Sequence, residues 1–217
     1  MPEPIYLYGA GSISTIVAEI VEAMGYRIKA RFDDDPDREQ GDTACEVRPG
    51  IRLVGRDSFP RLDAPCIISI GINCVRRELA GILPATYARA VHPSVLVSPS
   101  ATIGEGTIVL HGSIIQANTV IGRHVLVNTA ASIDHHCRID DFAHISPHAT
   151  VCGQVHVGEG SHIGAGATVI HCRKIGKWCT IGAGAVVIRD VPDNTTVVGN
   201  PARVLRADGA PERSGDA

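Results

Sequence analysis

A valine or isoleucine occupies every sixth position over a long stretch, and this period decides what the second half of the chain can fold into. The positions are Val91, Val97, Ile103, Val109, Ile115, Ile121, Val127, Ile133, Ile139, Ile145, Val151, Val157, Ile163, Val169, Ile175, Ile181 and Val187. Six is not a helical period, because an α-helix repeats about every 3.6 residues. A short, unbroken period instead indicates a repeat architecture.

Each hexad can supply one short flat strand and one turn, so three hexads close a triangular coil with the aliphatic residues pointing inward. The residue four places further on is mostly small, as a tight interior near a corner requires: Ala101, Thr107, Ser113, Thr119, Ala131, Cys137, Ala143, Ala149, Ser161, Ala167, Cys179 and Ala185. Coils would stack at about 4.8 Å, each covering the apolar layer of its neighbour. The spacing therefore predicts a parallel β-helix over 91–191, with between five and six coils.

The first ninety residues follow a different pattern, in which strands alternate with helices. Ile5–Tyr8, Ile28–Phe32 and Cys66–Ile70 are predicted strands. A first helix is expected after Ser12, which could cap it, and is ended by Gly25; a second runs from about Cys74 to Leu83. Residues 1–90 are thus predicted to form a small βαβ domain with a parallel sheet, roughly half of a dinucleotide-binding fold.

Composition narrows the function classes. A net charge of −3 offers no basic patch for nucleic acid, and no apolar run reaches about 18 residues, so no membrane span is expected. No signal peptide is expected from the amino-terminal residues, and seven cysteines without a CxxC pair favour reduced thiols and a cytoplasmic location. The β-helix domain is expected to end at 206, and the small polar residues of 207–217 to be disordered.

Several segments together resemble a known family. The hexads with the closing Val198-Gly199-Asn200-Pro201-Ala202-Arg203 resemble hexapeptide-repeat acyltransferases. Tyr8-Gly9-Ala10-Gly11, Asp33-Asp34, Ser69-Ile70-Gly71-Ile72-Asn73 and His92-Pro93-Ser94 look like the sialic-acid O-acetyltransferase family, which includes N-acetyltransferases for bacillosamine and perosamine precursors. The most specific part is the segment 128–137. The resemblance implies a left-handed β-helix, a homotrimer with active sites between subunits, and acetyl-CoA and a nucleotide sugar as substrates.

The resemblance also assigns the catalytic residues. It implies that His135 is the general base. His136 and Asp134 stand beside it in the sequence, and Asp134 or Asp141 could orient it. The family usually has an acid where this chain has His136, so the means of activating the base differs. It often has a histidine where this chain has Ile13, which bears on the sugar that is bound.

Other residues are assigned to the two substrates. Acetyl-CoA is expected to contact His144, Gly153, Gly164, Ala183, Asn200 and Pro201, where small side chains would let a pantetheine arm approach the backbone. The nucleotide sugar is expected at Gly9, Gly11, Ser12, Ile13, Asp33, Asp34, Gly71, Asn73 and Asn128. Backbone N–H groups at a helix start can bind a diphosphate, and an acidic residue about twenty positions on can bind ribose. Tight turns and solvated loops are the alternative explanations of the same residues.

The chemistry that these assignments imply is direct attack of an amine on the thioester of acetyl-CoA. A histidine titrates near pH 6.5 when free, which suits removal of a proton from the amine. No activated cysteine or serine is recognisable beside His135, and Cys137 stands at a small-residue position, so its thiol is expected to point inward.

Three alternatives remain open from the sequence. The first is O-acetylation of a sugar of the sialic-acid type, and the second is a non-catalytic trimeric scaffold. The third is the zinc carbonic anhydrase of the same fold, which needs three histidine ligands. His135 and His171 have its first spacing, but the third position is Gly176, so no metal is expected.

Overall fold

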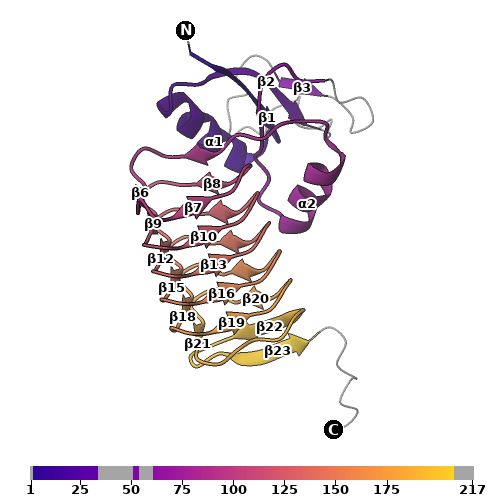
Figure 1. Ribbon diagram of the computed structural model, residues 1–217. Helices are drawn as coiled ribbons and strands as arrows, with labels where there is room; N and C mark the ends of the chain where they lie inside the picture. The colour runs from indigo at the N-terminus through magenta and orange to yellow at the C-terminus, as the bar shows by residue number, and fades with distance from the viewer. Residues whose placement is uncertain (1, 34–50, 54–60, 208–217) are drawn as a thin grey trace.

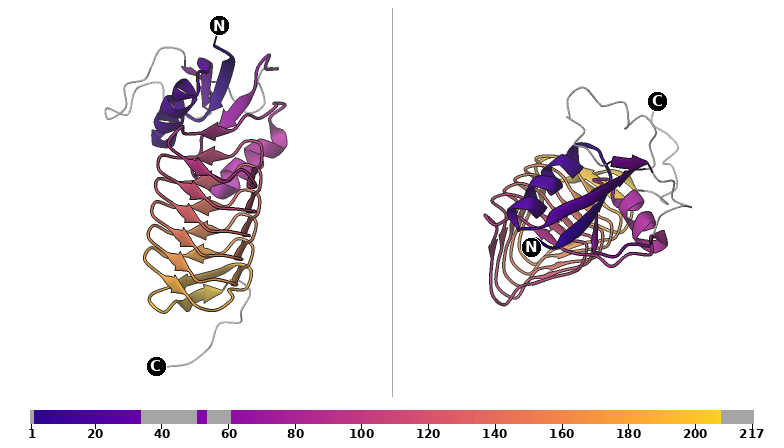
Figure 2. Two further views of the ribbon diagram at one scale, coloured as in Figure 1. Left: turned by 60° about the vertical axis from the view of Figure 1, so that its left-hand side comes forward. Right: turned by 90° about the horizontal axis from the view of Figure 1, so that it is seen from above.

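The computed structural model describes residues 2–33, 51–53 and 61–207. It consists of a small α/β domain at one end of a long parallel β-solenoid (Figure 1). Viewed from the side and from above, the solenoid is a prism whose first coils lie under the α/β domain (Figure 2). Asp34 and residues 208–217 lie outside the described residues, so the assignments made for them stay predictions.

The amino-terminal domain holds a four-stranded sheet in the order β3-β2-β1-β4, and all neighbouring strands are parallel. Its elements are β1 (Pro4–Tyr8), α1 (Ser12–Ala23), β2 (Arg27–Asp33), β3 (Ile51–Leu53), β4 (Cys66–Ile68) and α2 (Asn73–Ile82). The predicted strands and both predicted helices are confirmed. Strand β3 was not predicted, because its three residues carry too short a pattern.

Helix α1 packs one apolar face between the sheet and the solenoid. Val17, Ile20 and Val21 are fully buried, in one cluster with Ile108 and Leu126 of the solenoid. The prediction that Ser12 caps this helix is wrong. Gly11 occupies the N-cap position, no side chain caps the helix, and Ser12 is already the first helical residue.

Short strands stacked into three sheets build the solenoid. One sheet contains β5 (Ala90–Val91), β8 (Ile108–Val109), β11 (Leu126–Val127), β14 (His144–Ile145), β17 (His162–Ile163), β20 (Thr180–Ile181), β22 (Thr195–Val198) and β23 (Arg203–Ala207). The second contains β6 (Leu96–Val97), β9 (Ile114–Ile115), β12 (Ser132–Ile133), β15 (Thr150–Val151), β18 (Thr168–Val169) and β21 (Val186–Val187). The third contains β7 (Thr102–Ile103), β10 (Val120–Ile121), β13 (Arg138–Ile139), β16 (His156–Val157) and β19 (Lys174–Ile175).

The register confirms the hexad prediction. Each strand pairs with the strand one coil away, as Ile133 does with Val151, so inward residues stack on one another along the prism. From Val109 to Val187 every aliphatic hexad residue is buried. Val97, in the first coil, is 38% exposed because no earlier coil covers it. We refer below to the sheets that contain β5, β6 and β7 as the first, second and third faces.

Corner residues in the left-handed region join the faces. The non-glycine examples in the solenoid are Asn118, His124, Ala130, His136, Phe142, His148, Gln154, Cys172, Trp178 and Asn194, all with φ between 51° and 61°. Glycines 106, 112, 160, 166 and 184 serve the same purpose. Valine, isoleucine and threonine do not occur at the described positions with positive φ, because a β-branched side chain is strained there.

The last coil ends in an antiparallel pair formed by β22 and β23. The turn between these two strands also bonds to Val186 of β21. The backbone N–H of Val186 donates to the carbonyl of Gly199, and its carbonyl accepts from the backbone N–H of Ala202. No helix within the described ranges is both long and apolar enough to cross a bilayer.

Candidate active site

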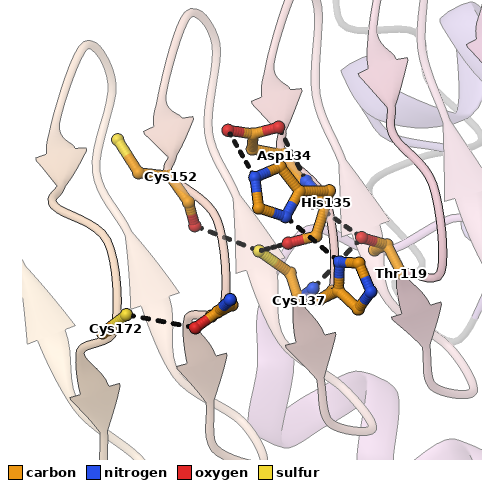
Figure 3. Close-up of polar contacts among 8 residues, drawn as sticks. Thr119, Asp134, His135, Cys137, Cys152 and Cys172 are labelled. Carbon is orange, nitrogen blue, oxygen red and sulfur yellow. Dashed lines mark hydrogen bonds and ion pairs between the residues drawn. The ribbon is translucent and has the colours of Figure 1, made fainter.

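The predicted base lies at the corner between the second and third faces (Figure 3). The backbone N–H of His135 donates to Oδ1 of Asp134 at 2.7 Å, and its Nε2 lies 4.0 Å from Oδ2 of the same carboxylate. The His135 side chain is 49% exposed, so its ring is open to a substrate. Asp141 does not share this site, because its carboxylate pairs with Arg123.

A glycine in the next coil makes room for the His135 ring. A Cβ on Gly153 would approach Cε1 of His135 to 2.7 Å and Nε2 to 2.8 Å. The sequence suggested that Gly153 accommodates pantetheine, whereas the described contact is with the imidazole. The ring is therefore supported from below by the bare backbone of the adjoining coil.

His136 contacts His135 and continues to a third polar side chain. The two Nδ1 atoms are 3.1 Å apart, and the rings meet edge to face. Nε2 of His136 lies 3.2 Å from the amide of Asn118, one coil earlier at the same corner. One of the two facing Nδ1 atoms must carry the hydrogen, so the tautomers of His135 and His136 are linked. Asn118 was not singled out from the sequence, and its position one coil before His136 is the signal that could have found it.

The thiol of Cys137 points into the prism, as predicted. The residue is 2% exposed, and its Sγ lies 3.1 Å from the carbonyl oxygen of Cys152. Burial raises its pKa to about 11. A protonated, enclosed thiol is a poor nucleophile, whereas the ring of His135 beside it is exposed.

A second cluster of histidines lies on the first face. The rings of His144 and His162 stack with centroids 4.7 Å apart. Nε2 of His144 lies 3.3 Å from the amide of Asn128, and Nε2 of His162 lies 2.7 Å from the hydroxyl of Ser146. Burial, with contributions from His162 and Arg76, lowers the pKa of His144 to about 3. His144 is therefore neutral at physiological pH and offers one donor and one acceptor.

These two histidines line a groove between the solenoid and the start of α2. The groove has a volume of about 480 Å³. Its lining comprises Gly71, Ile72, Asn73, Cys74, His144, Gly160, His162, Trp178, Cys179 and Thr180. Gly71 and Asn73, which were predicted to bind the sugar, thus line the same groove as His144, which was predicted to contact acetyl-CoA. His162 and Trp178 were assigned to neither substrate from the sequence.

The glycine turn after β1 is held by its own domain. Gly9 has φ +108°, and a Cβ there would approach the carbonyl oxygen of Ser69 to 2.9 Å. Oδ2 of Asp33 accepts a hydrogen bond of 2.6 Å from the backbone N–H of Ala10. Asp33 is buried, so its described contact fixes the turn. Ile13 packs against the cluster that joins α1 to the solenoid.

The remaining predicted acetyl-CoA residues are spread over the lower coils. A Cβ on Gly164 would collide with the backbone of the next coil, 2.5 Å from the carbonyl oxygen of Ile181, so packing alone requires glycine there. Ala183 is exposed near the corner between the first and second faces. Asn200 and Pro201 lie in the turn before β23, joined by a cis peptide bond. One chain does not bring these residues to His135.

Comparison with known proteins agrees with the fold. The PglD N-terminal domain family matches residues 4–83, and the bacterial transferase hexapeptide family, a motif of six repeats, matches residues 136–171 and 154–189. The fold and these matches define a hexapeptide-repeat transferase.

Solved structures specify the family. Perosamine N-acetyltransferase from Caulobacter crescentus, solved with CoA and GDP-perosamine, is 32% identical, with a TM-score of 0.79 over 93% of this chain and 96% of that chain. The acetyltransferase domain of PglB from Neisseria gonorrhoeae is 35% identical, with a TM-score of 0.80 over 94% of this chain and 100% of that chain. The chain therefore belongs to the nucleotide-sugar N-acetyltransferase family of hexapeptide-repeat proteins.

A curated relative agrees over a shorter region. UDP-N-acetylbacillosamine N-acetyltransferase from Bacillus subtilis is 38% identical over 111 residues, which cover 49% of this chain and 50% of that protein. The matched region thus spans about half the length of that relative.

The burial of Cys137 yields a chemical prediction. With a pKa of about 11, only about one Cys137 thiol in a thousand is ionised at pH 8, and its sulfur is enclosed. Iodoacetamide at pH 8 should therefore alkylate the exposed Cys74 and Cys172 first, leaving Cys137 unmodified until the protein unfolds. Peptide mass spectrometry over time checks the order. Labelling of native Cys137 as fast as Cys172 would show that the thiol is accessible.

Proposed function

We propose that this protein transfers the acetyl group of acetyl-CoA to an amino group of a nucleotide-linked amino sugar. Family membership supports the reaction class, because the Caulobacter relative was solved with CoA and GDP-perosamine. The observation that carries the proposal is the exposed imidazole of His135, supported on Gly153 and flanked by Asp134 and His136. Variants of the Caulobacter enzyme in which one histidine is replaced by asparagine or alanine were also solved with CoA and GDP-perosamine.

In the proposed mechanism His135 is the general base. The amine nitrogen attacks the thioester carbonyl carbon, and His135 accepts the proton that the nitrogen loses. The tetrahedral intermediate collapses with cleavage of the C–S bond, and the leaving CoA thiolate takes up the proton from the imidazolium of His135, which restores the base. No acyl-enzyme forms, which is consistent with the enclosed thiol of Cys137.

The contact between the two histidines offers a way to leave Nε2 of His135 free. If Nδ1–H of His135 donates to Nδ1 of His136, Nε2 of His135 keeps its lone pair. His136 then carries its hydrogen on Nε2, facing Asn118, whose amide oxygen accepts it when the amide is oriented that way. His136 and Asn118 thereby replace the acid that usually follows the base in this family.

We further propose that acetyl-CoA lies between subunits of a homotrimer. His135 is at the corner that ends the second face, and His144 is on the first face, so both can serve one reaction only if two chains contribute. On the second face the outward strand residues after Leu96 are Ile114, Ser132, Thr150, Thr168 and Val186, none of them charged. A flat, uncharged face suits close packing of a second subunit.

In this arrangement the other predicted contacts keep their proposed roles. Gly153, Gly164, Ala183, Asn200 and Pro201 would border acetyl-CoA together with His144. Gly9, Gly11, Ser12, Asp33 and Gly71 would hold the nucleotide sugar, with Asn128 beside His144.

The assembly is tested first. Multi-angle light scattering at micromolar concentration should give a mass about three times 22.9 kDa. Replacing Thr150 with arginine should weaken the trimer, because an unpaired charge would then be buried at the packed face; the control Lys174→Arg, on the charged third face, should not. A stable wild-type monomer would contradict the shared site.

The catalytic assignment is tested by thiol release from acetyl-CoA with a panel of nucleotide amino sugars. Because removal of a general base typically costs about 10²–10⁴ in rate, His135→Ala should lose kcat by that factor while keeping its oligomeric state and acetyl-CoA affinity. Cys137→Ala should stay active, and His136→Glu should preserve or raise activity. Near wild-type turnover by His135→Ala would refute the mechanism.

Acetylation of sugar hydroxyls alone would instead identify an O-acetyltransferase, and turnover of no sugar would favour a scaffold.

A further inference from the structure

A buried arginine joins the amino-terminal domain to the solenoid. Arg76, on α2, is fully buried, and among the described residues no carboxylate forms an ion pair with it. Its donors go to oxygen atoms of both domains. Nη1 donates to the carbonyl of Ile70 at 2.8 Å, Nε to that of His124 at 2.7 Å, and Nη2 to that of Phe142 at 2.9 Å.

The solenoid oxygens belong to corners, which explains why an arginine is needed. His124 and Phe142 occupy the same corner in successive coils, both with positive φ. Within the described chain, no backbone N–H is found to donate to these two carbonyls. Helix α2 covers them from water, and a buried carbonyl without a donor is costly. The five N–H groups of a guanidinium can satisfy several such oxygens at once.

Asn73 extends the contact to a third coil. Its Oδ1 accepts from Nη2 of Arg76 at 2.9 Å, and its Nδ2 donates to the carbonyl of Gly160 at 3.0 Å. Gly160 occupies the same corner as Phe142, one coil further on. Arg76 and Asn73 together therefore bind three stacked corners, a span of about 10 Å. The contacts described for Asn73 are thus with protein, although the sequence had assigned it to the sugar.

The same segment forms one wall of the groove described above. Ile70 and Gly71 accept hydrogen bonds from Arg76, and Gly71, Ile72 and Asn73 face His144 and His162 across the groove. A shift of α2 along the corners would therefore change the width of the groove. The buried positive charge also contributes to lowering the pKa of His144 and of His162.

We propose that Arg76 and Asn73 form a latch that positions the amino-terminal domain against the solenoid and so fixes the groove in which the sugar is presented to the acetyl donor. The kinetic part of this inference rests on the proposed function. Arg76 is a positioning residue, because it acts through Asn73 and the turn at 70–73 and is itself shielded from any ligand.

The chain contains its own reporter for the latch. Trp178, its single tryptophan, lines the groove together with Asn73 and Cys74. The latch variants Asn73→Ala and Arg76→Lys should shift its fluorescence to longer wavelength and increase quenching by acrylamide, because a loosened α2 admits water. The control Arg27→Met removes an exposed arginine from the same domain and should leave the emission unchanged.

Kinetics then separate a latch from a direct sugar contact. Because a displacement near 1 Å can cost about 10²-fold, each latch variant should lose up to that factor in kcat/KM for the nucleotide sugar. KM for acetyl-CoA should change less, because His144 alone among its proposed contacts lines this groove. In the double variant the losses should not add, because one unit is already broken.

Each outcome decides the proposal. Additive losses, with unchanged tryptophan emission in the folded Asn73→Ala protein, would show that Asn73 binds sugar directly and would overturn the latch. An Arg76→Lys protein that fails to fold leaves Asn73→Ala as the deciding variant. If the wild-type protein acetylates no nucleotide sugar, the proposed function fails; a red-shifted, non-additive fluorescence response would still establish the latch, and its absence would overturn it.

Discussion

Each coil of this protein depends on residues that hold the backbone in the left-handed region at its corners. A non-glycine residue in this conformation costs roughly 1–2 kcal/mol, and the solenoid contains many, among them Asn118, His136 and Phe142. Burial of the hexad aliphatics offsets that cost, because each inward Val or Ile from Val109 to Val187 is buried between neighbouring layers. The hexad period and the corner conformation are therefore two requirements of one structure. Neither a helix nor an ordinary sheet satisfies both.

The corners also place the chemistry. His136 turns the chain sharply out of the second face, which leaves the ring of His135 exposed and resting on Gly153 in the next coil. At another corner the carbonyls of His124 and Phe142 point away from the prism, where Arg76 binds them. The repeat thus provides both the exposed histidine that we propose as the base and an attachment for the amino-terminal domain. The strict stacking of coils keeps the two at fixed positions.

Much of the fold could be predicted because its signals are local or periodic. The inward hexad positions, the strands β1, β2 and β4, and the inward thiol of Cys137 all follow from patterns within a few residues. The cap of α1 was misassigned to Ser12, since Gly11 can end an extended segment without a side-chain bond.

Features that depend on distant contacts were not predictable. Arg76 meets carbonyls 48 and 66 positions away, and Gly153 is required by a ring in the preceding coil. Gly164 looked like a ligand contact, yet the backbone of the next coil already excludes a side chain there. Asn118 could have been found by asking which residue stacks on His136 one coil earlier.

The central claim is that one active site takes His135 from one subunit and His144 from another. Mixing inactive His135→Ala and His144→Ala proteins by joint unfolding and refolding tests it most directly. If neighbouring subunits of a trimer share each site, random mixing should restore roughly a quarter of wild-type thiol release, since one interface in four then carries both histidines. A refolded mixture as inactive as its parts, with mixed trimers verified by mass spectrometry, would contradict the account.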